Sequence, residues 1–201
     1  MQQILKISYY FLASLTALTA VFFSSAQILN TGYYGYDVYG VYDGYGGYDG
    51  SGGYGDESIS ARHSALVALY NSTNGAEWTN KDNWNAVVGS ECNWYGVTCA
   101  SGEITNLTLP GNNLNGFIPQ ELGDLTSLTY LSLSDNQLSG SIPTELGNLT
   151  SLTNLNLRTN QLSGSIPTEL GNLANLVTLN LGSNQLSESI PTQLGNLASL
   201  A

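Results

Sequence analysis

Apolar and polar residues alternate in a fixed pattern that begins near Ile104 and returns every 24 residues. The leucines follow LxxLxLxxNxLxGxIPxELGxL, and one full copy reads LTSLTYLSLSDNQLSGSIPTELGNL. Each copy carries one asparagine and one proline at fixed places, which are Asn112, Asn136, Asn160 and Asn184, and Pro119, Pro143, Pro167 and Pro191. A period of about 20–30 residues with this leucine spacing is typical of a solenoid built from stacked coils. The pattern therefore indicates a surface that holds a partner rather than a pocket for catalysis.

Within one copy, Leu131 and Leu133 alternate with polar neighbours, which predicts a strand with one buried face. Stacked copies of this strand would form a parallel sheet on the concave side. A short helical turn on the convex side is expected to begin at Pro143, and Gly140 suits a turn with positive φ. The side chains expected to point inward are Leu138, Ile142, Leu146 and Leu149.

The recurring asparagine lies where the strand must turn. Its amide can satisfy backbone groups left unpaired at the bend and can bond the asparagine of the next copy. We therefore expect a structural ladder formed by Asn112, Asn136, Asn160 and Asn184.

The repeat resembles the plant-type class of the leucine-rich repeat family, and the resemblance extends over about residues 56–201. It implies an α/β fold, a right-handed solenoid with a parallel concave sheet and an N-terminal helical cap. The class is common in receptor ectodomains and cell-wall defence proteins. The resemblance therefore implies recognition of a partner without cofactors and without enzymatic activity.

The residues before the repeats match the cap of this class. Residues 56–70 predict an amphipathic helix with Ile59, Leu66, Leu69 and Tyr70 on one face and Ser58 or Ser60 as its N-cap. The following segment ECNWYGVTC matches the family motif Cys-x-Trp-x-Gly-Val-x-Cys from Cys92 to Cys99. The three tryptophans are expected to be buried in the cap, the alternative being a carbohydrate-binding platform.

The remaining N-terminal residues predict an exported chain. Residues 1–26 combine Lys6, an apolar stretch and a small-residue cleavage site, as a signal peptide does, while an uncleaved membrane anchor is the alternative. Residues 27–55 are rich in glycine, tyrosine and aspartate and predict a disordered linker or an adhesive segment. The expected domains are thus 1–26, 27–55, the cap at 56–103, and the repeats at 104–201 with four full copies and a truncated fifth.

Net charge limits the classes of partner, while the cysteines and sequons predict covalent modifications. A formal net charge of −11 disfavours nucleic acid and anionic lipid, and no membrane contact is expected after signal cleavage. Export favours a disulfide between Cys92 and Cys99, although a metal or redox pair is the alternative. Three sequons would place N-linked glycans at Asn71, Asn148 and, obstructing the concave face, Asn106.

In solenoids of this family the ligand usually meets the exposed residues of the concave strands. The candidates are Tyr130, Ser132, Asp135, Asn154, Asn156, Arg158, Thr178 and Asn180. Tyrosine and arginine are enriched in binding hot spots, which directs attention to Tyr130 and Arg158. No catalytic set is expected, because His63 has no nucleophile partner and Glu121, Glu145 and Glu169 are regularly spaced on the convex edge.

The last copy departs from the family pattern, since Glu188 replaces the glycine of earlier copies and the chain stops early in a fifth coil. A fragment, or a dimer that caps itself end to end, would explain this. The leading hypothesis is a secreted or cell-surface module that binds a protein or peptide. Alternatives are the ectodomain of a receptor-like kinase, and a cell-wall enzyme inhibitor or ice-binding protein, with cell-wall association.

Overall fold

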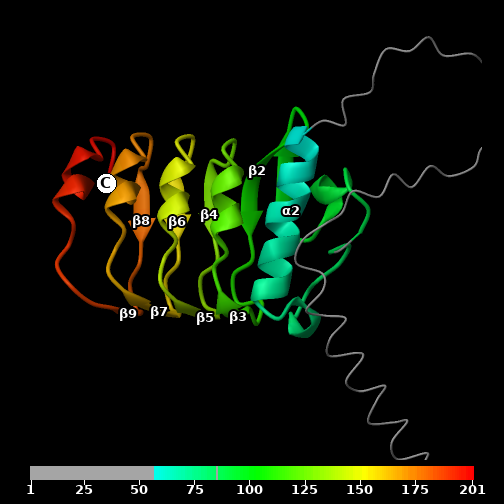
Figure 1. Ribbon diagram of the computed structural model, residues 1–201, viewed down its shortest axis with the longest axis horizontal. Coiled ribbons are helices and arrows are strands. Elements are labelled where there is room, and N and C mark those ends of the chain that lie inside the picture. The colour runs from blue at the N-terminus through cyan, green and yellow to red at the C-terminus, as the bar shows by residue number, and fades with distance from the viewer. Residues whose placement is uncertain (1–56, 85) are drawn as a thin grey trace, which may run out of the picture. The chain divides into compact units, whose positions relative to one another are not determined.

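The computed structural model describes residues 57–84 and 86–201 of the 201-residue chain. The predicted signal peptide (1–26) and linker (27–55) lie outside the described residues. In the described part, repeated coils stack side by side from the cap to the C-terminus (Figure 1). The fold is the expected right-handed α/β solenoid. No helix within the described ranges is long and apolar enough to span a bilayer.

Helix α2 (Glu57–Ser72) lies at the N-terminal end of the solenoid (Figure 1). The expected inward residues Leu66 and Leu69 are fully buried, and Tyr70 packs against the same core. The side chains of Ile59 and of the two candidate N-cap serines are not among those that the structure describes. The helix therefore covers the apolar end of the first coil, as a terminal unit of a solenoid must.

Five strands form the sheet expected on the concave side, in the order β1-β2-β4-β6-β8. Their bounds are Val97–Ala100 (β1), Glu103–Thr108 (β2), Tyr130–Ser132 (β4), Asn154–Asn156 (β6) and Thr178–Asn180 (β8). The last four strands are parallel, whereas β1 is antiparallel to β2, so the sheet is not parallel throughout. Strand β2 begins at Glu103, so the expected boundary between cap and repeats falls within it.

A second sheet, which the sequence did not lead us to expect, runs along another side of the solenoid in the order β3-β5-β7-β9 (Figure 1). Its strands are Asn115–Phe117 (β3), Gln137–Gly140 (β5), Gln161–Gly164 (β7) and Gln185–Leu186 (β9). The sheets differ in register. In the five-stranded sheet, Leu107 pairs with Leu131, the residue one full repeat later in the chain. In the four-stranded sheet, Ser139 pairs with Gln161, which lies two residues before the end of a full repeat.

Short 3-10 helices form the convex side. They are η3 (Gln120–Asp124), η4 (Thr144–Asn148), η5 (Thr168–Asn172) and η6 (Thr192–Asn196). Pro143 lies at the N-cap of η4, one residue before the helical turn that was expected to begin with it. Gly147 allows close stacking here, because a Cβ on it would lie 2.5 Å from the carbonyl oxygen of Glu169 in the next coil.

The core is a continuous column of leucines that ends in the tryptophans of the cap. Leu138, Ile142, Leu146 and Leu149 are at most 2% exposed, which confirms the expected inward set. Trp78, Trp84 and Trp94 are buried as expected, and each indole N–H donates a hydrogen bond, to Thr73 O, Tyr95 O and Ser90 Oγ respectively. These tryptophans therefore belong to the core and not to an exposed platform.

Candidate ligand-binding surface

Polar side chains of the five-stranded sheet line up in columns, because the strands pair at the full repeat distance. Tyr130 lies in register between Asn106 and Asn154, and Asn154 in turn faces Thr178. Tyr130 and Asn154 are half-buried and Thr178 is exposed. This register brings one side chain from each of four coils onto the same face of the sheet.

A second column on this face contains one residue that was wrongly expected to be accessible. Ser132 pairs in register with Asn156, which in turn pairs with Asn180, and both asparagines are half-buried. Ser132 itself is only 3% exposed. In the register of the sheet it lies between Thr108 and Asn156, and its burial makes it inaccessible to a ligand.

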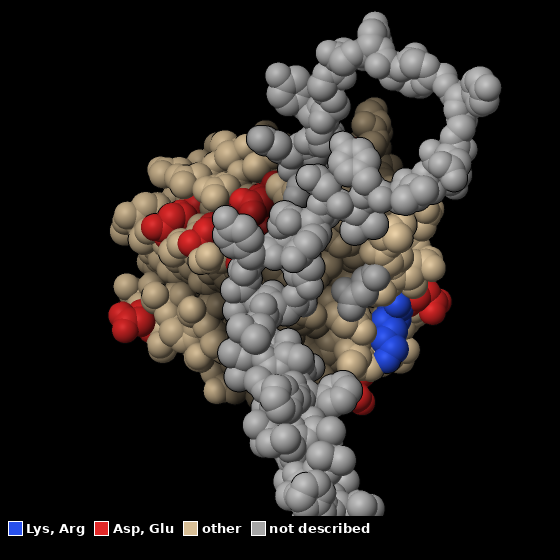
Figure 2. Space-filling model, turned by 45° about the vertical axis from the view of Figure 1, so that its right-hand side comes forward, with Lys and Arg blue, Asp and Glu red and all other residues tan. Residues whose placement is uncertain are grey.

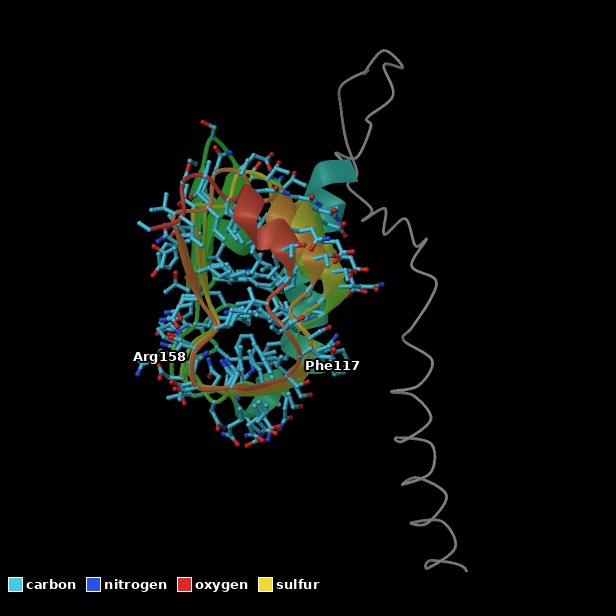
Figure 3. The ribbon with its side chains drawn as sticks, turned by 90° about the vertical axis from the view of Figure 1, so that its left-hand side faces the viewer. Phe117 and Arg158 are labelled. Atoms are coloured by element: carbon cyan, nitrogen blue, oxygen red, sulfur yellow. A yellow bond between two sulfur atoms is a disulfide. The ribbon has the colours of Figure 1, made fainter. Side chains whose placement is uncertain are left out.

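The charged candidates lie where the chain leaves this sheet. Arg158 and Asp135 are both exposed, and the Asp135 N–H donates a 2.9 Å hydrogen bond to the Arg158 carbonyl. Arg158 is the only basic residue in residues 82–201. Figure 3 shows it on the side opposite to Phe117. The surface therefore presents one guanidinium and one carboxylate beside columns of uncharged amides and hydroxyls.

Local hydrogen bonds hold the asparagines of this surface. The Oδ1 atom of Asn156 accepts from the Arg158 N–H at 3.1 Å, and that of Asn180 accepts from the Gly182 N–H at 3.2 Å. Asn154 Oδ1 accepts from the hydroxyl of Thr153 at 2.9 Å. These bonds orient the side-chain amides, whose nitrogens supply hydrogen-bond donors on this surface.

The asparagine column forms its ladder through the backbone. Asn136 Oδ1 accepts from the backbone N–H groups of Asn112 and Leu114 in the preceding coil, at 2.9 and 3.0 Å. Its Nδ2 donates to three carbonyls, including that of Leu109. Asn160 and Asn184 each accept from one backbone N–H of the preceding coil, that of Leu138 or Leu162, and donate to a carbonyl there. Asn112 bonds the backbone of Asn80 in the cap. Among the described residues, these side chains reach backbone groups of the preceding unit and not the next asparagine's side chain.

The cap carries a hydrogen bond between a histidine and a buried carboxylate that was not anticipated. His63 Nδ1 lies 2.7 Å from Oε1 of Glu91, which is 4% exposed. Burial alone would raise the pKa of Glu91, but the backbone N–H groups of Glu91 and Gly89, together with His63, outweigh it and hold this pKa below 4.5. Glu91 directly precedes the Cys92–Cys99 disulfide, so the contact and the disulfide fix the same turn.

Comparison with known proteins agrees with this architecture. The family model for the leucine rich repeat matches residues 103–162, and a second leucine rich repeat model matches residues 175–197. The BIR2 ectodomain of Arabidopsis thaliana is 38% identical, with a TM-score of 0.59 over 69% of this chain and 75% of that chain. The chain belongs to the plant-type leucine-rich repeat family.

Other relatives of this leucine-rich repeat protein are receptor kinases. A probable inactive receptor kinase of Arabidopsis thaliana is 41% identical over 73 residues, 36% of this chain and 10% of the kinase. The ectodomain of GASSHO1/SCHENGEN3, solved in complex with CASPARIAN STRIP INTEGRITY FACTOR 2, is 38% identical with a TM-score of 0.62, over 71% of this chain and 17% of that chain. The chain thus spans about a tenth of the length of the first curated relatives, and their catalytic domains are not covered.

Two features of the repeat protein escaped the reasoning from sequence. The His63–Glu91 contact joins residues 28 apart, and no local pattern relates them. The other is Phe117, which is 58% exposed at a place where the later copies have Ser141, Ser165 and Ser189. For Phe117 the signal was available, because it is the one aromatic residue in an otherwise uniform column.

Proposed function

We propose that this leucine-rich repeat protein is a secreted or cell-surface recognition module that binds a protein or peptide on its concave sheet. The observation that carries the proposal is the register of the five-stranded sheet, which lines up Tyr130, Asn154 and Thr178 beside Asn156 and Asn180. Exposed Arg158 and Asp135 border these columns. Amide donors and one guanidinium suit the carbonyl oxygens and carboxylates of an extended chain.

The comparison with GASSHO1/SCHENGEN3 supports a protein or peptide ligand, because that ectodomain was solved with CASPARIAN STRIP INTEGRITY FACTOR 2 bound. A second candidate is that the chain is part of the ectodomain of a receptor-like kinase. It is favoured by the match to receptor kinases over a small share of their length. Both candidates use the same concave surface, and downstream coding sequence with a membrane span would select the second.

The test is a pairwise binding screen of the full chain against a library of secreted proteins and peptides. Tyr130→Ala combined with Arg158→Ala should weaken a recovered interaction by at least about tenfold, since tyrosine and arginine contribute strongly to interfaces. The matched control is Gln137→Ala combined with Gln161→Ala, which alters two exposed residues of the four-stranded sheet. If the concave variant leaves every recovered interaction unchanged, the proposed surface is wrong.

We further propose that the exported chain carries glycans at Asn71 and Asn148, which are both exposed. Asn106 is half-buried in β2 and faces Tyr130, so a glycan there would cover the ligand surface. Expression in a eukaryotic secretory system followed by peptide mass analysis tests both points. A glycan found on Asn106 in a chain that still binds its ligand through Tyr130 would contradict the proposed position of the ligand surface. Absence of glycans from Asn71 and Asn148 would contradict the proposed glycosylation.

A further inference from the structure

Phe117 ends strand β3 and leaves a large apolar side chain in solvent. It is 58% exposed, and the equivalent residues Ser141, Ser165 and Ser189 are polar. The side of the coil on which it lies is opposite to Arg158 (Figure 3). An exposed aromatic residue of this kind contributes nothing to the core, and such residues commonly mark sites of contact with a partner.

The ring of Phe117 borders a groove of about 570 Å³ between the first two coils. The apolar residues that line it are Phe117, Ile118, Pro119, Ile142 and Pro143. Polar lining comes from residues including Gln120, Ser141 and Thr144. A volume of this size lies in the range of sites that hold a small ligand or a few side chains.

Two carboxylates, those of Glu121 and Glu145, also line this groove, and both are half-buried. They lie on η3 and η4, which stack as successive coils do, and Glu169 follows at the same place on η5. Figure 2 shows acidic side chains gathered in one area of the surface that it views. Like charges on successive coils repel each other and together attract a cation.

Within the described residues, the basic side chains lie elsewhere. Arg62 forms an ion pair with Glu103 at 2.7 Å, and the Lys81 ammonium donates to the Ala76 carbonyl. Arg158 lies on the opposite side from Phe117. No ion pair joins any of these cations to Glu121 or Glu145 in the part of the chain that the structure describes.

We propose that this groove is a second docking site, distinct from the concave surface, for a basic segment of a partner protein. An apolar or aromatic side chain of that segment packs on Phe117, and a neighbouring lysine or arginine pairs with Glu121 and Glu145. The uncompensated charge of the groove selects a cationic segment over an acidic one. A chain with two such surfaces on opposite sides can hold two proteins at once.

The test uses the full chain, labelled with 15N, and three synthetic peptides measured by NMR titration. One peptide has a phenylalanine between two lysines, the second replaces the lysines by glutamates, and the third replaces the phenylalanine by alanine. At up to about 1 mM, the first should shift the amides of Phe117, Ser141 and Thr144 and the other two should not. Because the contact is partly ionic, raising the salt concentration should weaken it.

Substitutions in the protein complete the test. Phe117→Ser, which copies the residue of the other coils, should weaken binding of the first peptide about tenfold, and Glu145→Gln should weaken it about threefold. Glu169→Gln and Val177→Ser are matched controls, one acidic and one exposed apolar residue outside the groove, and should leave binding unchanged. Tyr130→Ala combined with Arg158→Ala should also leave it unchanged, which separates this site from the concave one.

Several outcomes would overturn the proposal. They are equal shifts with the lysine and glutamate peptides, no shift at the highest concentration, or full binding by Phe117→Ser with unchanged thermal unfolding. Chitohexaose and a dilution series of the protein alone are run in parallel. If chitohexaose shifts the amide signals of the groove while the lysine peptide does not, the occupant is a sugar and the proposal is wrong. If dilution of the protein shifts them instead, the occupant is a second copy of the chain and the proposal is also wrong.

Discussion

The Nδ1 atom of His63 lies 2.7 Å from Oε1 of Glu91, and this contact joins α2 to the turn that holds Cys92. Because the pKa of Glu91 in the folded chain lies below its ordinary value of 4.5, the ionised carboxylate stabilises the fold above that pH. This contribution is lost as the pH falls through the lower, folded-state pKa. Glu91→Gln should therefore cost about 1–3 kcal/mol at neutral pH and reduce the loss of stability in acid. Urea unfolding measured from neutral to acidic pH checks both effects.

The control for this prediction is Glu103→Gln, which removes the carboxylate of the more exposed pair with Arg62. An exposed ion pair of this kind contributes less than about 1 kcal/mol. An unchanged pH dependence in Glu91→Gln would show that the buried contact does not stabilise the cap through charge.

Glu188 has a φ of 72°. The equivalent residues of the two preceding coils are Gly140 and Gly164, with φ of 77° and 78°. A side chain with a Cβ is strained in this region, so Glu188→Gly should stabilise the fold by about 1 kcal/mol. Thermal unfolding followed by circular dichroism measures the change. Gly182→Ala is the control, because its φ is not in the strained region and its nearest contact is 3.5 Å away, and it should be neutral.

Gly147 and Gly195 occupy the same place in two coils but differ in what surrounds them. A Cβ on Gly147 would lie 2.5 Å from the Glu169 carbonyl oxygen, whereas nothing lies within 4 Å of a Cβ on Gly195. Gly147→Ala should therefore separate two coils and cost about 1–3 kcal/mol, while Gly195→Ala should not destabilise. Equal unfolding midpoints for the two variants in urea would contradict the close stacking of the convex side.

Asn160 is 8% exposed and bonds the backbone of two coils. It donates to Leu133 O and accepts from Leu138 N–H in the preceding coil, and it donates to Leu157 O in its own coil. Asn160→Ala leaves buried backbone groups without partners and should cost about 3 kcal/mol. Asn175→Ala is the control, since Asn175 is exposed and donates to the single carbonyl of Thr150. Denaturant titration measures the free energy of unfolding of both variants. A similar loss of stability in Asn160→Ala and Asn175→Ala would argue against the ladder as a main source of stability.

Much of the fold could be predicted from sequence because the leucine period determines which face of each coil is buried. Leu131, Leu133 and Leu138 are all fully buried, as the pattern indicates. The second sheet could not be predicted in this way, since the polar residues of Gln137–Gly140 show no alternation and their strand forms by pairing with neighbouring coils.

The candidate site shows the same division between pattern and packing. Columns on the concave sheet follow from the period, whereas the burial of Ser132, at a position where the equivalent Asn156 and Asn180 are half-buried, does not. Phe117 could have been identified as the exception in a serine column, but the groove beside it depends on how two coils pack. The His63–Glu91 contact depends on where the helix meets the disulfide turn.

The difference in register between the two sheets constrains the shape of any ligand that crosses several coils. On the five-stranded sheet, Tyr130, Asn154 and Thr178 are direct neighbours, so an extended chain running perpendicular to the strands meets equivalent positions at each step. On the four-stranded sheet, Ser139 faces Gln161 and equivalent residues are displaced by about two residues, or ~6.6 Å, per coil. A straight ligand there would have to run obliquely, so only the concave sheet presents a matching periodic row to a linear polymer.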